Sequence, residues 1–300
     1  MIFITLKWNK LSYIFISDLE SLMRNFYRLM LGRKSIHAES CFNGSFVGTD
    51  FDIHQDLSGK LPDNWRDFNK EFIPIYLENK PDKSKITAGL ACGAIWTVSK
   101  GMDQGDIVLC PDGAGHYRVG EIAGVYKYEN GEILPHRRPV RWLDLNIERS
   151  AMSEDLQHSC GSIGTISNVS KYSAEIERFL QGVKVETIED SSSFALEKHL
   201  EDFLVKNWNS TDLGKDYIIY EEDGETSGQQ YATDTGPIDI LAISKDQKTL
   251  LVIELKKGKA SDDVVGQILR YMNYVKEVLA EPDQNVRGIV IALDDDQKLR

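Results

Sequence analysis

The chain has 300 residues, of which 41 % are hydrophobic and 27 % charged, a composition typical of a globular protein long enough for two domains. No stretch reaches the roughly 18 apolar residues that a membrane span needs, and no signal-peptide cleavage pattern follows the N-terminal segment. The formal net charge is -12, and because Lys plus Arg equals Asp plus Glu up to Ser150, the whole acidic excess follows that residue. A broad phosphate-binding surface is therefore disfavoured in the second half.

The cysteine pattern bears on the cellular compartment. Cys41, Cys92, Cys110 and Cys160 lie far apart, and no two of them form a C-x-x-C pair. This spacing argues against both a zinc knuckle and a disulfide framework. We therefore expect a cytoplasmic protein without a membrane partner.

The first part of the chain predicts a small α+β domain. Residues 1–22 fit neither predicted domain and are interpreted as an extension, and the domain itself is expected over residues 23–182. Short strands between Gly and Pro turns, together with a few helices, favour a compact, partly closed barrel. Strands are predicted at NFYRLMLG, GDIVLC, YRVGEIAGVYKY and RPVRWLDL, and helices at DNWRDFNKEFIPIYLEN, ITAGLACGAIW and KYSAEIERFLQG.

The second part predicts an α/β domain with a mixed sheet flanked by helices. A polar linker is expected at 183–192 and the domain at 193–300. The strands IDILAIS and LLVIEL flank the turn KDQK and should form a hairpin. VRGIVIAL is predicted as a further strand after a helix that begins near Ser261. Apolar stripes mark two helices: Leu196, Leu200, Phe203 and Leu204 on the first, and Val264, Ile268, Tyr271, Val275 and Leu279 on the second.

Three ionisable residues stand at the ends of the two hairpin strands. Side chains alternate along a strand, so Glu254 and Lys256 share one face. Asp239 lies about as far before the turn as Glu254 lies after it, which allows the two carboxylates to meet. Two carboxylates and an ammonium are costly to desolvate without partners, and a divalent cation is the simplest partner for the carboxylates. The alternative is a solvated ion pair where a strand leaves the core.

The motif order G-P-I-D, then E-L-K, then a helix with Gln267 and Tyr271 resembles the PD-(D/E)xK nuclease superfamily, most closely its NucS-like endonuclease branch. The resemblance implies a restriction-endonuclease-like fold in which Asp239 and Glu254 bind Mg²⁺ or Mn²⁺. It also implies that Lys256 acts on the attacking water. Gln267 and Tyr271, four residues apart on one helical face, would brace the site or contact the DNA backbone.

The same resemblance implies a glutamate on the preceding helix. Glu197 and Glu201 are the candidates, one turn apart beside the apolar stripe. We favour Glu197, because it precedes the Leu200 and Leu204 ridge as the superfamily pattern does. Glu201 is the alternative.

The first domain is loosely similar to PUA-like and EVE-like barrels, through GDIVLCPDG and the following YRVGEIAGVYKY. Some of those barrels hold a modified or flipped base in an aromatic-lined pocket. Scattered aromatic residues in a small barrel also commonly form its core. The basic stretch HRRPVR at 136–141 is a candidate for phosphate contacts or a solvated turn. The aromatic residues that would line a base pocket are Trp65, Trp96, Tyr117, Tyr126 and Trp142.

Taken together, the motifs predict a metal-dependent endonuclease that hydrolyses DNA. A reader domain before a nuclease domain resembles the layout of Mrr-like modification-dependent restriction systems. Cleavage of both strands by one active site per chain would call for a homodimer. The alternatives are a non-catalytic nucleic-acid-binding protein, and a nuclease that acts on RNA or on branched or mismatched DNA in repair.

Overall fold

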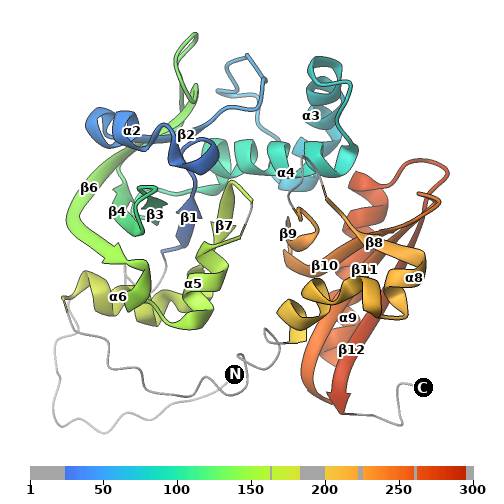
Figure 1. The fold of residues 1–300 in the computed structure, drawn as a ribbon. Helices are drawn as coiled ribbons and strands as arrows, with labels where there is room; N and C mark the ends of the chain where they lie inside the picture. Colours follow the sequence, from blue (N-terminus) through green and yellow to red (C-terminus); the bar gives the residue numbers. More distant parts are fainter. Residues whose placement is uncertain (1–23, 163, 183–199, 222–225, 260–261, 295–300) are drawn as a thin grey trace, which may run out of the picture.

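The computed structural model describes residues 24–162, 164–182, 200–221, 226–259 and 262–294. These residues form two mixed sheets with helices packed against them, coloured blue to green and orange to red in Figure 1. The predicted α/β class is confirmed. Within the described ranges, no helix combines the length and apolar character that crossing a membrane requires. The predicted extension and linker lie outside these ranges.

The first sheet has seven strands in the order β2-β6-β4-β3-β1-β7, with β5 paired to β6. β1 runs parallel to β3, and the other pairs are antiparallel. Because β2 and β7 stand at the two ends of this path, hydrogen bonding in the described residues leaves the sheet open. The strands are β1 (Phe26–Leu29), β2 (Phe46–Thr49), β3 (Ile107–Pro111), β4 (His116–Ile122), β5 (Lys127–Tyr128), β6 (His136–Glu148) and β7 (Ile166–Asn168).

Helices α2 (Ala38–Gly44), α5 (Glu154–Cys160) and α6 (Ser173–Leu180) accompany this sheet. α5 begins at Ser153, whose hydroxyl accepts a hydrogen bond from the Leu156 amide, as an N-cap does. The buried Glu175 carboxylate of α6 accepts two bonds from Ser153, at 2.7 Å from the amide and 2.6 Å from the hydroxyl. The start of α5 is therefore fixed against α6. The four cysteines are free and buried.

The second sheet has the order β12-β11-β10-β8, with β9 paired to β10. β10 and β11 form the predicted antiparallel hairpin, whereas β11 and β12 are parallel. The parallel pair is joined through helix α9 (Asp262–Tyr274), which continues into a π-helical turn, η6 (Val275–Leu279). The strands are β8 (Tyr217–Ile219), β9 (Gln229–Thr233), β10 (Gly236–Ser244), β11 (Thr249–Lys259) and β12 (Asn285–Asp294). Before β8 lie the helical residues 200–206, η5 (Trp208–Ser210) and α8 (Leu213–Asp216).

Side chains of β11 alternate as predicted. Leu250 and Val252 belong to the core beneath α9, and Leu251, Ile253 and Leu255 belong to the core on the opposite face. All five residues of the predicted α9 stripe are buried. The stripe predicted on the preceding helix was wrong at one position. Leu200, Leu204 and Val205 pack against the sheet, so the buried face is displaced toward Val205 and leaves Phe203 62 % exposed. Leu196 lies outside the described residues.

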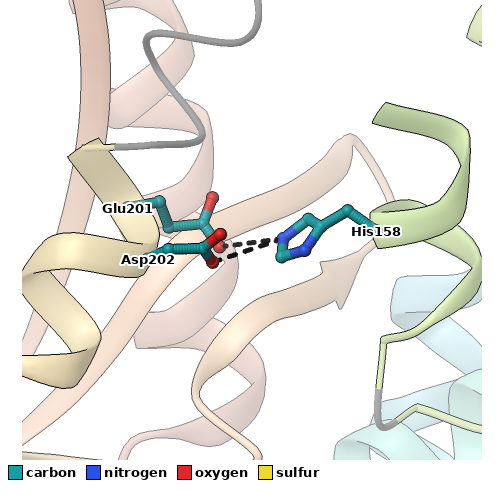
Figure 2. Close-up of side chains that lie close together, drawn as sticks. All are labelled: His158, Glu201 and Asp202. Carbon is teal, nitrogen blue, oxygen red and sulfur yellow. Dashed lines mark ion pairs between the residues drawn. The ribbon is translucent and has the colours of Figure 1, made fainter. Parts of the chain in front are cut away.

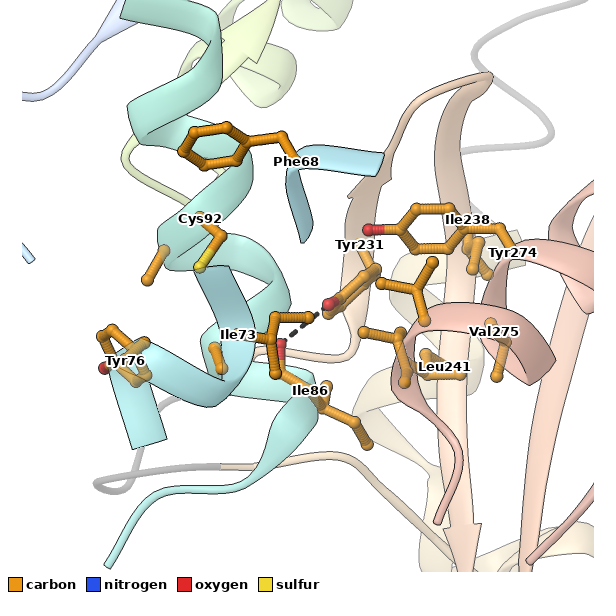
Figure 3. Packing of buried hydrophobic residues seen from close by; sticks show 14 of the residues in the cluster. Phe68, Ile73, Tyr76, Ile86, Cys92, Tyr231, Ile238, Leu241, Tyr274 and Val275 are labelled. Carbon is orange, nitrogen blue, oxygen red and sulfur yellow. Dashed lines mark hydrogen bonds between the residues drawn. The ribbon is translucent and has the colours of Figure 1, made fainter. Parts of the chain in front are cut away.

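Helices α3 (Trp65–Asn79) and α4 (Lys85–Trp96) pack on the second sheet, although the sequence assigns them to the first domain. Phe68, Ile86 and Cys92 share one buried cluster with β9, β10 and α9 (Figure 3). The Tyr231 hydroxyl donates to the Ile86 carbonyl over 2.8 Å, and Asn69 Nδ2 donates to the Tyr274 hydroxyl over 3.1 Å. The largest hydrophobic core therefore contains elements from both parts of the chain.

The close approach of α4 to the second sheet depends on a glycine. A Cβ atom at Gly89 would lie 2.6 Å from Leu279 Cδ2 and 2.8 Å from the Tyr231 hydroxyl. Such distances are shorter than van der Waals contact, so a larger residue would displace the side chains of Leu279 and Tyr231 or α4 itself. Gly89 thus allows the two parts of the chain to share a core.

Candidate active site

The hairpin register brings Asp239 and Glu254 together. Ile240 pairs with Ile253 and Leu241 with Val252, so the next pair toward the open end of the hairpin is Asp239 with Glu254. Directly opposite residues of an antiparallel pair point to the same face. The predicted register is confirmed.

Asp239, Glu254 and Lys256 line one pocket of about 200 Å³. Asp239 Oδ2 accepts a hydrogen bond from the Leu255 amide over 2.8 Å. Lys256 Nζ lies 2.8 Å from Glu254 Oε1, and the Lys256 side chain is 28 % exposed whereas that of Glu254 is 2 % exposed. The Glu254 carboxylate is therefore enclosed, whereas the Lys256 ammonium group that pairs with it is partly accessible from the pocket.

The local electrostatics favour the neutral form of Asp239. Burial, followed by the negative charges of Glu254 and Glu201, raises the pKa of Asp239 to about 8. The Leu255 amide and Lys256 act in the opposite direction but are outweighed. Because Asp239 is buried beside two other carboxylates, it stays protonated at neutral pH unless positive charge is added nearby.

This environment predicts a pH-dependent stability in the absence of divalent cations. The folded pKa of about 8 exceeds the unfolded value of about 3.9, so the stabilising contribution is complete below the unfolded pKa and is lost as pH rises through the folded pKa. In EDTA, the Tm of the wild type should therefore fall between about pH 4 and about pH 8, and level off above that. Asp239→Asn should flatten this fall, because its side chain cannot ionise.

Thermal unfolding followed by circular dichroism would measure the effect. Asp246→Asn is the matched control, since Asp246 lies exposed in the hairpin turn and should keep the wild-type slope. Parallel curves for wild type and Asp239→Asn would contradict the expected titration.

Glu201 joins the same pocket through two glutamines. The Glu201 carboxylate is 4 % exposed and accepts hydrogen bonds from Gln229 Nε2 over 2.8 Å and from Gln230 Nε2 over 2.7 Å. Gln230 Nε2 also lies 3.2 Å from Asp239 Oδ1, so it connects the two carboxylates. Glu197, the favoured candidate on this helix, lies outside the described residues. Of the two glutamates, Glu201 is the one that the structure places in the pocket.

Gln267 and Tyr271 also line the pocket, from helix α9. Gln267 Nε2 donates to the Tyr271 hydroxyl over 3.1 Å. Tyr271 is 2 % exposed, and burial, with the charges of Glu254 and Asp239 acting in the same direction, raises its pKa. Tyr271 thus serves the core and the pocket at once, and the two side chains are oriented by one another.

Sequence reasoning missed Gln229, Gln230 and His158. The two glutamines begin β9, the strand before G-P-I-D, and pairing of β9 with β10 sets Gln230 beside Asp239. A strand predicted at QQYAT would have revealed them. His158 lies on α5, and its Nε2 is 3.7 Å from Glu201 Oε1 and 4.0 Å from Asp202 Oδ1 (Figure 2). Nothing local in the sequence indicates this contact, because it depends on how the two parts of the chain dock.

The five aromatic residues proposed for a base pocket do not converge. Trp65 and Trp96 stack at 6.1 Å between ring centroids, beside the core shared with the second sheet. Tyr117 is buried in one core of the first sheet and Trp142 borders another. Tyr126 bonds His136 over 2.9 Å. The five aromatic side chains therefore belong to different hydrophobic cores and do not line one common pocket.

The basic stretch at 136–141 is largely used inside the fold. His136 is fully buried, and Arg138 donates to the backbone carbonyls of Val98, Ser99 and Gly124. Arg137 donates to carbonyls of the preceding turn. Only Arg141 of these four side chains is mostly exposed, at 63 %, and it pairs with Glu121 at 2.7 Å. Most of the donors that could bind phosphate at this stretch are therefore already hydrogen-bonded within the protein.

Comparison with known proteins identifies the part of the chain that carries this pocket. Residues 197–298 match the family model "Endonuclease NucS C-terminal domain". This segment is NucS-like. Residues 27–170 match a second family model, described as "Domain of unknown function (DUF8426)". The NucS-like segment contains Glu201, Asp239, Glu254 and Lys256, whereas His158 belongs to the other.

Two archaeal relatives share the name Endonuclease NucS. The protein of Sulfolobus acidocaldarius is 35 % identical over 82 residues, which are 26 % of this chain and 31 % of that protein. The protein of Methanocaldococcus jannaschii is 34 % identical over 74 residues, 25 % of this chain and 27 % of that protein. The chain thus spans less than a third of these curated relatives. Among solved structures, a repair endonuclease from Pyrococcus abyssi aligns with a TM-score of 0.28 and 17 % identity, covering 62 % of this chain and 59 % of that one.

Proposed function

We propose that this protein is a metal-dependent endonuclease that hydrolyses phosphodiester bonds in DNA. The observation that carries the proposal is the meeting of Asp239, Glu254 and Lys256 at one pocket, next to the buried carboxylate of Glu201. The match of the same segment to an endonuclease domain supports it.

The donor set at this pocket fits Mg²⁺ or Mn²⁺. Asp239 and Glu254 stand opposite one another and offer carboxylate oxygens, the ligands that hard divalent cations prefer. A cation would also offset the burial, and the repulsion from Glu254 and Glu201, that raise the pKa of Asp239. When bound, the ion would polarise the scissile phosphate and lower the pKa of a coordinated water.

The protein groups around the carboxylates have separable roles in this proposal. Lys256 Nζ, held by Glu254 at 2.8 Å, would orient the attacking water and stabilise negative charge on the phosphate oxygens. Glu201 would support the metal ligands through Gln230. Gln267 and Tyr271 would fix the far wall of the pocket or contact the DNA backbone.

The DNA feature that is recognised remains to be found by experiment. A reader of modified bases in the first part of the chain would support modification-dependent restriction, but the aromatic residues expected to form its pocket are dispersed. A structure-specific repair nuclease needs no such pocket. Because each chain would carry one active site, cleavage of both DNA strands would require a homodimer.

A cleavage assay tests the proposal directly. The purified full chain, incubated with Mg²⁺ or Mn²⁺, should cut DNA, and excess EDTA should abolish cutting. Plain, cytosine-modified, mismatched and single-stranded substrates should be compared, with a matched RNA. Binding without cleavage on every substrate would favour the non-catalytic alternative, and preference for mismatched over modified DNA would favour repair over restriction.

A further inference from the structure

The contact between α5 and the nuclease-like segment has the composition of a cation site. His158 Nε2, Glu201 Oε1 and Asp202 Oδ1 all lie within 4.8 Å of one another (Figure 2). Ligand atoms of one ion are separated by about 3 to 4 Å when each metal bond is about 2 Å. The observed distances of 3.7 and 4.0 Å from the imidazole to the carboxylates are already within that range.

The glutamate of this trio is prepared for coordination. Its carboxylate is 4 % exposed, and Gln229 and Gln230 fix both oxygens from the side of β9. Hydrogen bonds of this kind orient metal ligands in proteins and are costly to lose. Oε1 also lies nearest to His158, whereas Oε2 is directed through Gln230 toward Asp239.

The charge of the surroundings points to a cation independently of this geometry. Among the described residues, the adjoining pocket is lined by the carboxyl groups of Asp155, Glu201, Asp239 and Glu254 and by two lysines, Lys171 and Lys256. Asp202 adds a further carboxylate beside it. With one cation at the Asp239 and Glu254 pair, a second cation beside His158 would offset the charge of the Glu201 and Asp202 carboxylates.

We propose that His158, Glu201 and Asp202 form a second divalent-cation site that joins the first part of the chain to the nuclease-like segment. An imidazole nitrogen with two carboxylates favours a transition metal such as Mn²⁺ or Zn²⁺ over Mg²⁺, which prefers an all-oxygen shell. Bound there, the ion would fix α5 against residues 200–206 with Glu201 shared between the two neighbouring sites. The proposal does not depend on nuclease activity.

Counting bound Mn²⁺ tests the site without any cleavage assay. Free Mn²⁺ is measured by electron paramagnetic resonance during titration of the full chain, with and without excess Mg²⁺. The wild type should bind two Mn²⁺ per chain alone, and one when Mg²⁺ occupies the all-oxygen site. His158→Ala should bind one Mn²⁺ alone and none in excess Mg²⁺. Asp239→Asn should bind one under both conditions.

Two further variants complete the test. Asp202→Asn keeps the shape of a half-exposed side chain and should weaken binding of the second Mn²⁺ by at least about tenfold. His116→Ala removes a comparable histidine, 3.2 Å from the Asp112 carboxylate, and should leave both counts unchanged. Circular dichroism in EDTA should show that His158→Ala remains folded.

Each result has a definite meaning. Equal Mn²⁺ counts and affinities for wild type and His158→Ala would overturn the second site, and would leave His158 as a contact of the two carboxylates without a metal. A wild type that binds a single Mn²⁺, lost in His158→Ala but kept in Asp239→Asn, would support the second site while removing the proposed nuclease cation.

Discussion

Lys256→Ala should lower kcat for DNA cleavage by about 10²–10³-fold, the usual cost of removing one group that stabilises charge in the transition state. The effect should fall on kcat more than on KM, because Lys256 is one ammonium in a small pocket and contributes little of the contact area for DNA. Cleavage rates under single-turnover conditions, with DNA binding measured separately by fluorescence anisotropy, would separate the two.

The control for this variant lies on the same hairpin. Lys248 is exposed in the turn at the opposite end of β11, so Lys248→Ala removes an equal charge without touching the pocket and should cleave as the wild type does. Because Lys256 neutralises the enclosed Glu254, Mn²⁺ affinity of Lys256→Ala should be measured as well. Cleavage by Lys256→Ala at the wild-type rate would remove Lys256 from the chemistry.

Residues 193–300, produced without the first part of the chain, should fail to form a stable fold. Without α3 and α4, the side chains of Tyr231, Ile238, Leu241 and Tyr274 lose their cover. Exposure of a buried side chain of this size costs about 1.5–3 kcal/mol. Several such losses together approach the whole stability of a domain, about 5–15 kcal/mol.

Two measurements would check this expectation. The fragment should elute as aggregate in size-exclusion chromatography and lack a cooperative thermal transition, whereas co-expression with residues 24–182 should recover a soluble complex. Gly89→Leu in the full chain should reproduce part of the defect, because its side chain meets Leu279 and Tyr231. A monodisperse fragment that unfolds cooperatively at the Tm of the full chain would show that the shared core is dispensable.

The predictable part of the structure is the part that local patterns control. Alternation along β11 and the length of the 245–248 turn were enough to predict that Asp239 and Glu254 meet, since strand register follows from the apolar face and the turn. The stripe of α9 likewise identified its buried face, including Tyr271. The metal, its ligands and the catalytic roles stay predictions.

What the sequence did not indicate depends on contacts between distant segments. The apolar faces of α3 and α4 are visible in the sequence, but the partner they pack against is not, and β9, β10 and α9 lie far along the chain. The contact of His158 could not be predicted either, because it forms only when α5 packs against residues 200–206. The place of Glu201 at the pocket likewise depends on tertiary structure, since the phase of a helix relative to a sheet is not a local property, whereas Glu197 lies outside the described residues.

Asn69 on α3 holds the hydroxyl of Tyr274, and Tyr274 stands one helical turn from Tyr271, whose own hydroxyl receives Gln267. These side chains connect Asn69, buried on α3, with the pocket of the other segment, which Tyr271 and Gln267 line. A substitution of Asn69 would remove the donor to the Tyr274 hydroxyl and so disturb the helix that carries Tyr271, which means that a mutation in the first half of the chain is transmitted to the pocket of the second.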